Sequence, residues 1–290
     1  MLRSVIGPME ALVYPYNFAR ADRVEEGSVE IEYDLDEARW PWLALPPRHP
    51  VLIEKYQYFG AVTVALAQSF VEPSTFTALT AFDWECPEDQ DPDPATRGVF
   101  VDSSTPDRPS FEMILCNSTG EHVATGRGSG FVFRGMNIDA WRAQSKERVR
   151  DSRAARLLSE ADPESAGLGS DGTSFLSPAY TERGIATADG LITTDRGFHP
   201  NHPFHTGSGD HVNAGHLFDC ALQFAHLVTR SEEALVCTGG SARFRQFTEL
   251  DVPFGVQQVT TGEGAGARTV RMTFSQLGTP TAELELRFGR

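Results

Sequence analysis

The sequence lacks cysteine pairs, long apolar runs and an excess of positive charge. Its four cysteines lie far apart and form no CxxC pair: Cys86, Cys116, Cys220 and Cys237. This pattern favours free thiols in a reducing compartment over a disulfide framework. No run approaches the roughly 18 apolar residues of a membrane span, and the N-terminus lacks the apolar core of a signal peptide. We therefore expect a cytoplasmic protein with no membrane partner.

Positive charge is scarce, since 25 Lys and Arg face 40 Asp and Glu and the net charge is −15. Such a balance opposes the phosphate neutralisation on which nucleic-acid binding depends, and no basic cluster compensates for it. We expect no nucleic-acid partner. The length of 290 residues suits a duplicated domain, because single cores usually stop growing at about 250–300 residues.

Histidine, by contrast, is concentrated: six of the eight histidines lie between residues 199 and 229. From Ala214 to Val228 nearly every residue is apolar. The polar exceptions follow one another at steps of three, four and three: His216, Asp219, Gln223 and His226. This spacing places all four on one face of a helix that is otherwise apolar and therefore buried. A buried carboxylate needs partners or a raised pKa, and both suit a general acid or base.

The order of elements predicts a duplication. The first half contains a strand at 28–35, a helix from Val51 to Phe70, and strands from Thr75 and from Ser110 onward. The second half repeats this order around the helix that follows the histidines. We therefore predict an α+β double hotdog, in which two tandem repeats each wrap an antiparallel sheet around a long central helix. The expected boundaries are a repeat at 1–150, a linker at 151–178 and a repeat at 179–290.

Motifs in the second half resemble the A-factor biosynthesis hotdog family. DHVNAG at 210–215 and LFDCALQ at 217–223 are similar to that family's DHVPGM and LLEAARQ, and FRQFTELDVP at 244–253 is similar to its strand motif. The first half matches more loosely, at HPVLIEKYQYFGAVTVALAQ from 49 to 68. The resemblance implies specialised metabolism of the polyketide type, in which a β-ketoacyl thioester is joined to dihydroxyacetone phosphate to give butyrolactone signals.

The sequence departs from that family at the residues that matter most for its chemistry. Asp219 stands where the family has Glu, and Leu222 replaces its Arg. The corresponding positions of the first repeat hold Lys55, Tyr58 and Phe59, so we expect that repeat to be catalytically degenerate. A phosphorylated partner requires a cationic anchor, and neither helix supplies the family's Arg.

A second resemblance concerns spacing in the β-hydroxyacyl-thioester dehydratases. There a catalytic His precedes an acidic residue of the central helix by fourteen positions and a Gln follows, as in His205, Asp219 and Gln223. Such groups remove the α-proton and protonate the β-hydroxyl, while helix-end NH groups polarise the thioester carbonyl. The candidate catalytic residues are His205, Asp219, Gln223 and His211. The candidate substrate-binding residues are Phe204, Asn213, Gly215 and His216.

Several alternatives stay open at this point. His199, His202 and His205 recur at every third position, but Pro200 and Pro203 disrupt a regular metal-binding presentation, and we expect no metal and no cofactor. The histidine-rich loop is also compatible with a polar surface, and His226 with a structural role.

The favoured function is an enzyme, a dehydratase-like lyase acting on acyl thioesters of acyl carrier protein or coenzyme A. Condensation of the A-factor type, thioester hydrolysis and acyl binding without catalysis are the alternatives. We expect a monomer or a homodimer.

Overall fold

The computed structural model describes residues 18–25, 27–69, 77–87, 92–103, 105, 108–133, 140, 142–143, 145–147, 159–168, 172–206, 210–230, 235–264 and 267–289, with backbone only for 261–264 and 267. Its two long helices are α1 (Pro50–Ala67) and α3 (Ala214–Thr229), and η3 (Pro41–Ala44) is a short 3₁₀ helix. The strands of the first half are β1 (Ala19–Glu25), β2 (Ser28–Tyr33), β3 (Thr77–Glu85), β4 (Arg97–Asp102), β5 (Ser110–Cys116) and β6 (His122–Val132). Those of the second half are β7 (Tyr180–Glu182), β8 (Ile185–Gly190), β9 (Val236–Phe244), β10 (Phe254–Gly264), β11 (Ala267–Gln276) and β12 (Thr279–Gly289).

All strands belong to one twelve-stranded antiparallel sheet with the order β1-β2-β4-β5-β6-β3-β9-β12-β11-β10-β8-β7. From either edge inward, the strands follow the same order relative to the helix of their half. The first half runs β1, β2, β4, β5, β6, β3 from its edge, and the second half runs β7, β8, β10, β11, β12, β9 from the other edge. In each half the two outermost strands precede the helix in sequence, and the innermost strand is the one that directly follows it. This symmetric order is consistent with the expected double hotdog.

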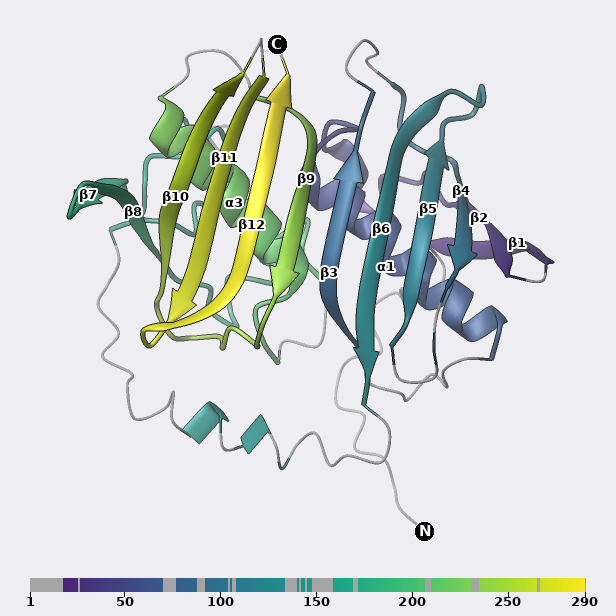
Figure 1. The fold of residues 1–290 in the computed structure, drawn as a ribbon, viewed down its shortest axis with the longest axis horizontal. Helices are drawn as coiled ribbons and strands as arrows, with labels where there is room; N and C mark the ends of the chain where they lie inside the picture. Colours follow the sequence, from purple (N-terminus) through teal and green to yellow (C-terminus); the bar gives the residue numbers. More distant parts are fainter. Residues whose placement is uncertain are drawn as a thin grey trace.

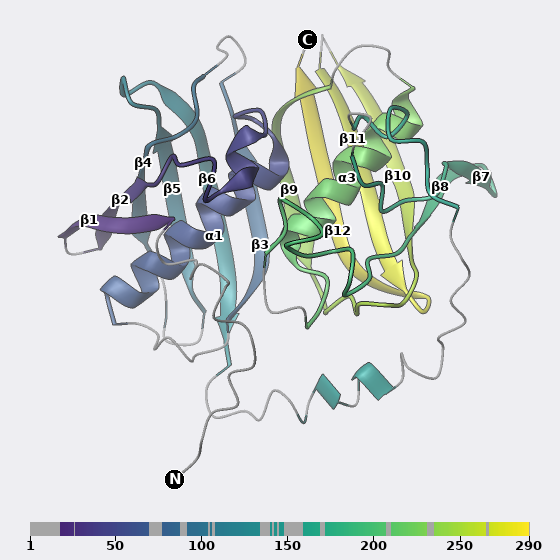
Figure 2. The same ribbon diagram turned by 180° about the vertical axis from the view of Figure 1, so that it is seen from behind.

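Both helices lie on the same side of the sheet, as the two opposite views show (Figures 1 and 2). α1 covers the first half, α3 covers the second, and the two helices contact each other. The halves are joined through the sheet by β3 and β9, which pair from Ala81 opposite Arg243 to Glu85 opposite Gly239. Residues of both halves therefore share one core beneath the paired strands.

The two predicted helices are confirmed, and their ends follow from the local sequence. α1 begins with Pro50 at its first position, a place where a missing NH is tolerated, and the Nδ1 atom of His49 accepts a hydrogen bond from Val51 N at 3.2 Å. α3 begins after Asn213, whose side chain caps it. The predicted end of the first helix at Phe70 lies outside the described residues, in which α1 ends at Ala67.

The predicted domain boundaries stay a prediction. Much of the expected linker at 151–178 lies outside the described residues. The described end of that segment packs in the second half, where Leu176 is fully buried and pairs with Gly190.

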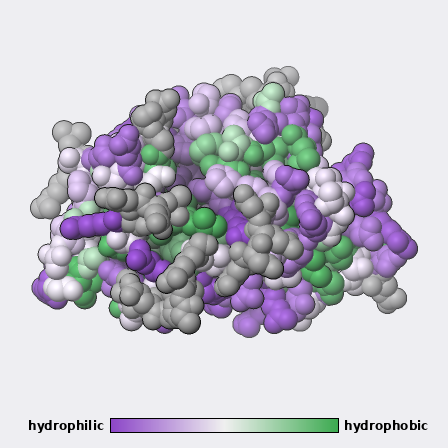
Figure 3. Space-filling model, turned by 90° about the horizontal axis from the view of Figure 1, so that it is seen from above, coloured by the Kyte–Doolittle hydropathy of each residue, from purple (hydrophilic) through white to green (hydrophobic). Residues whose placement is uncertain are grey.

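No helix in the described ranges is long and apolar enough to cross a membrane. On the face of the molecule seen from above, hydrophilic and hydrophobic areas are interspersed and neither covers the face continuously (Figure 3).

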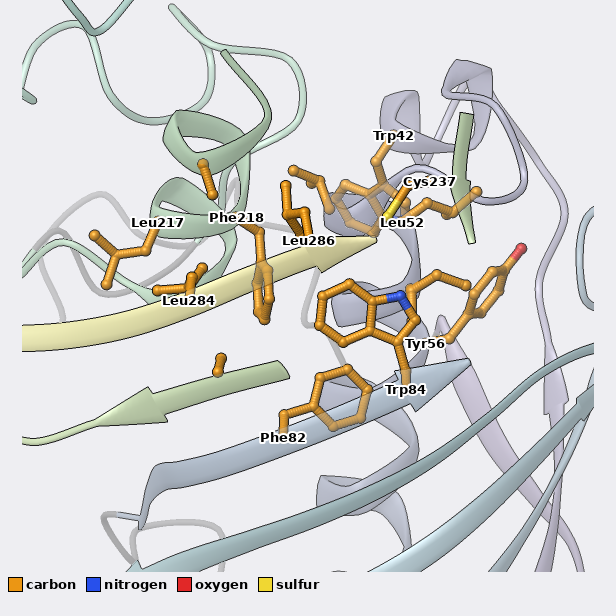
Figure 4. Packing of buried hydrophobic residues seen from close by; sticks show 14 of the residues in the cluster. Trp42, Leu52, Tyr56, Phe82, Trp84, Leu217, Phe218, Cys237, Leu284 and Leu286 are labelled. Atoms are coloured by element: carbon orange, nitrogen blue, oxygen red, sulfur yellow. The ribbon is translucent and has the colours of Figure 1, made fainter. Parts of the chain in front are cut away.

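The junction between the halves is filled by aromatic side chains (Figure 4). The ring of Trp84 on β3 stacks on Phe82 with centroids 5.4 Å apart and meets Phe218 of α3 edge-on at 5.2 Å. Opposite Trp84, β9 carries Gly240. A Cβ atom on Gly240 would lie 2.3 Å from the indole Cη2. Glycine is therefore required there, because the indole crosses the junction in the space where a side chain would stand.

We expect Gly240→Ala to lower the free energy of unfolding by about 1–3 kcal/mol or more, since overpacking a filled core displaces its neighbours. Gly255→Ala is the matched control, because Gly255 also lies in a strand but its Cβ would meet only Ser275 O, at 4.0 Å. Urea unfolding of the two variants measures the difference. Equal stability of both would show that the junction is not closely packed.

Candidate active site

The loop before α3 turns two histidines into the core. His199 N donates to His205 O at 2.9 Å, and His202 N donates to Phe198 O at 3.0 Å, so the loop folds back on itself. The side chains of His202 and His205 are consequently buried, with 4% and 0% exposure. His199 remains exposed at the surface.

The buried imidazoles form part of a continuous stack of rings. His205 lies in the middle, with the centroid of His202 at 4.3 Å on one side and that of His216 at 4.1 Å on the other. Phe175 lies alongside the three imidazoles, 5.1 Å from His202 and 5.9 Å from both His205 and His216, and Phe198 meets His216 edge-on at 4.8 Å. This ring stack fixes the plane of His205 and excludes water from both of its faces.

His205 and Asp219 form a buried dyad. The Nε2 atom of His205 lies 2.9 Å from Oδ2 of Asp219. The other carboxylate oxygen accepts a hydrogen bond from Gln223 Nε2 at 3.0 Å, and Gln223 Oε1 in turn accepts one from Phe175 N at 3.0 Å. Among the described residues, the Nδ1 atom of His205 has no hydrogen-bond partner although it is buried. The protein therefore fixes one nitrogen of this imidazole and leaves the other free.

Burial sets the protonation of the dyad. It lowers the pKa of His205 well below its usual value, and the neighbouring His202 lowers it further. Burial also raises the pKa of Asp219, although the charges of nearby groups and the hydrogen bond from Gln223 act against this. The imidazole is consequently neutral in the resting site and can accept a proton. A buried carboxylate with a raised pKa beside a neutral imidazole is a common property of acid–base sites.

His216 and Asn213 hold the start of α3. Asn213 Oδ1 accepts from His216 N at 3.1 Å, while Asn213 N donates to Nδ1 of His216 at 3.3 Å. The Nε2 atom of His216 lies 2.7 Å from the carbonyl oxygen of Gly197 and donates to it. Both ring nitrogens of His216 are thus used by backbone groups, which favours a role in positioning the helix and the ring stack.

The other predicted site residues lie at the edges of this arrangement. His211 is partly exposed and contacts Asp210 and Phe247, and in the described part of the chain it does not contact the dyad. The contact with His211 has the largest effect among those that lower the pKa of Asp210. Phe204 is half-buried, packs against the core, and its ring meets His202 edge-on at 5.8 Å.

Groups of the first half also reach the site. His49, which caps α1, is close enough to Asp219 for each to shift the pKa of the other. Lys55 and Glu54 of α1 lie against Gly215, and a Cβ atom there would be 3.1 Å from the Nζ of Lys55 and 3.1 Å from Oε2 of Glu54. Sequence analysis did not identify His49 or Glu54 and placed Lys55 only among degenerate positions. The available signal was two charged residues inside an apolar helix.

His202, His205 and Asp219 bring three potential metal ligands within 4.8 Å of one another. A metal must lie near the plane of each imidazole that binds it, where the nitrogen lone pair points. The rings of His202 and His205 are stacked at 25°, so their lone pairs run side by side and do not converge. The Nε2 atom of His205 is also engaged by Asp219. The ring geometry therefore fits an acid–base dyad better than a metal site.

We expect the protein to lose stability as the pH falls from about 7 to 5. Burial lowers the pKa of five histidines: His49, His202, His205, His216 and His226. The pKa of His49 falls to about 4. Below about pH 6.5 the unfolded chain binds protons at these rings and the native chain does not, so the free energy of unfolding decreases. Each ring contributes up to about 1.4 kcal/mol per pH unit.

Urea titrations at several pH values measure this slope. The raised pKa of Asp219 contributes in the opposite direction, because its stabilising protonated form is lost only as the pH rises. His205→Asn is the matched variant and should flatten the slope by about one proton. Constant stability between these pH values would contradict the neutral, buried imidazoles.

Comparison with known proteins identifies the fold. No family model and no curated protein sequence matches the chain, so the resemblance to the A-factor family is not shown. The tesB protein of Mycobacterium avium subsp. paratuberculosis is similar over 93% of this chain and 95% of its own, with TM-score 0.51 and 11% identity. The 12:0-ACP thioesterase from Umbellularia californica is similar over 92% of this chain and 100% of its own, with TM-score 0.52 and 9% identity. At these identities the likeness concerns the fold alone, and the chain has a hotdog fold with a large antiparallel sheet.

Proposed function

We propose that this chain is an acyl-thioester processing enzyme in which His205, assisted by the carboxylate of Asp219, transfers protons at the α and β carbons of the acyl chain. The observation that carries the proposal is the buried contact of 2.9 Å between Nε2 and Oδ2, which leaves Nδ1 of the same ring without a partner among the described residues. The similar fold of a thioesterase that acts on 12:0-ACP supports a thioester carried by acyl carrier protein or coenzyme A.

The dyad assigns a separate role to each group. When Nε2 carries the hydrogen and donates it to Asp219, Nδ1 holds a lone pair and is the base. Removal of the α-proton by Nδ1 gives an imidazolium, which the neighbouring carboxylate stabilises, and an enolate on the thioester. The imidazolium then gives the proton to the β-hydroxyl, the carbon–oxygen bond breaks, and water and an enoyl thioester are released. Gln223 keeps the carboxylate in position through its hydrogen bond to Asp219.

The dyad belongs to the second of two related halves. We infer from the symmetric strand order that the halves are tandem repeats of one hotdog unit. Counted from the first residue of each helix, the position of Asp219 corresponds to Lys55 in α1. Within the described residues, the first half therefore has no dyad of the same kind at this position, and we infer that the acid–base centre lies in the second half.

Two other reactions fit the same dyad. In hydrolysis, Nδ1 deprotonates a water molecule that attacks the thioester carbonyl, the carbon–sulfur bond breaks, and the imidazolium returns the proton to the leaving thiolate; the similar fold of the 12:0-ACP thioesterase favours this reaction. Condensation of a β-ketoacyl thioester with dihydroxyacetone phosphate requires a cation for the phosphate. Lys55 provides a positive charge beside the start of α3, although the family's Arg is absent.

We expect Asp219→Asn to lower kcat by about 10²–10⁴-fold, which is the usual contribution of an acid–base group. The substitution keeps the size of the side chain, so the free energy of unfolding should change by no more than about 1–2 kcal/mol. Incubation with β-hydroxy-, β-keto- and enoyl-thioesters of coenzyme A and of acyl carrier protein, with and without dihydroxyacetone phosphate, is analysed by mass spectrometry. Loss of water, a phosphate-containing adduct or a free acid identifies the reaction.

His226→Ala is the matched control on the same helix. The ring of His226 packs on Gly167, where a Cβ atom would lie 2.3 Å from the ring. We expect this variant to lose about 1–2 kcal/mol of stability and to keep its turnover. Near-wild-type turnover by Asp219→Asn on a substrate that the native enzyme converts would rule out the acid–base role.

A further inference from the structure

Lys55 is a buried cation beside the dyad. Its residue exposure is 3%, and Nζ lies 3.1 Å from Oε2 of Glu54 and 5.9 Å from the ring centroid of Trp42. Removal of two charges from water is expensive, and a buried ion pair is often no more stabilising than a well-packed apolar pair. Apart from this ion pair, the buried Oε2 of Glu54 has no hydrogen-bond partner within the described residues. The pair is therefore poorly explained as a contribution to stability.

The pair lies where α3 begins. Both Nζ of Lys55 and Oε2 of Glu54 are 3.1 Å from the place that a Cβ atom on Gly215 would occupy. The cap of α3 uses the NH groups of Asn213 and His216. The NH of Gly215 has no protein acceptor among the described residues. The Lys55–Glu54 pair and this NH therefore both lie at the first turn of α3, where the helix dipole is positive.

Electrostatic influence connects Lys55 with the dyad. Burial is the largest cause of the lowered pKa values of His202, His205 and His216, and the charge of Lys55 lowers all three further. The same charge acts against the burial that raises the pKa of Asp219. The positive charge of Lys55 therefore favours the neutral form of the base.

We infer that Lys55 is a substrate-binding residue, whose ammonium binds the thioester carbonyl oxygen at the first turn of α3 while His205 removes the α-proton. This inference rests on the proposed function. Negative charge develops on the carbonyl oxygen as the enolate forms, and a fixed cation in a dry site stabilises that charge strongly. The site therefore combines a base from the second half with a cation from the first half. It favours ligands that place an oxygen anion at the end of an acyl chain.

The test removes both charges at once in the double variant Lys55→Met with Glu54→Gln, since removal of Lys55 alone would leave a buried, unpaired carboxylate. We expect kcat/KM on the converted thioester to fall by about 10²–10³-fold, as for the loss of one oxyanion donor, with circular dichroism unchanged. Lys146→Met is the control, because Lys146 is half-exposed and pairs with Asp210. The kcat/KM of Lys146→Met should stay within about two-fold of the native value.

Ligand binding provides a readout that does not depend on turnover. Calorimetry compares decanoate, whose carboxylate resembles the enolate oxygen, with decan-1-ol. The native protein should bind decanoate at least about ten-fold more tightly, and the double variant should lose this preference, which corresponds to about 1.4 kcal/mol.

The possible results separate the two proposals. Turnover by the double variant within about three-fold of native, or a native protein without preference for decanoate, would overturn the role of Lys55. If the native protein converts no thioester but prefers decanoate, and the double variant loses this preference, the anion site is supported and the proposed function is rejected. If the double variant does not fold, Lys55→Arg, which retains the charge, must keep most of the decanoate preference.

Discussion

The position of a carboxylate inside an apolar helix is the constraint on which the site depends. Asp219 is buried within α3, and a charge there is unfavourable without partners. His205 and Gln223 each bond one of its oxygens. The loop before α3 must therefore fold inward to deliver His205, and the ring stack holds that imidazole in place. A free nitrogen on a fixed, neutral ring is the chemical result.

The junction of the two halves makes the site a shared one. β3 and β9 join the halves into a single sheet, and Trp84 fills the core beneath that pairing. The helices consequently lie close enough for α1 to place Lys55 against the first turn of α3. The first half thus places a charged pair at the start of the helix that carries Asp219.

The sequence predicted those features of the fold and the site that depend on residues close together in the chain. Apolar helices of the observed length and the spacing between His205 and Asp219 were readable, because helical periodicity and a short loop determine them. The stacking of His202 on His205 depends on the fold of a proline-containing loop, which no periodicity describes. Lys55 meets Gly215 and His49 approaches Asp219 across 160 and 170 positions of the chain. The charged residues of α1 were visible in the sequence, but their partners in the other half were not. The regular spacing of His199, His202 and His205, which suggested a metal site, was also visible in the sequence. The ring orientations that argue against a metal site depend on the folded loop and could not be predicted from the sequence.

The central claim is that His205 removes a proton next to a thioester carbonyl. Exchange of the α-hydrogens of a saturated acyl thioester with D₂O, followed by nuclear magnetic resonance, measures this step whether the complete reaction is dehydration or condensation. The account predicts enzyme-dependent incorporation of deuterium at the α carbon, which His205→Gln abolishes while the variant remains folded. Incorporation at the same rate in that variant, or none in a native enzyme that processes the thioester, would contradict it.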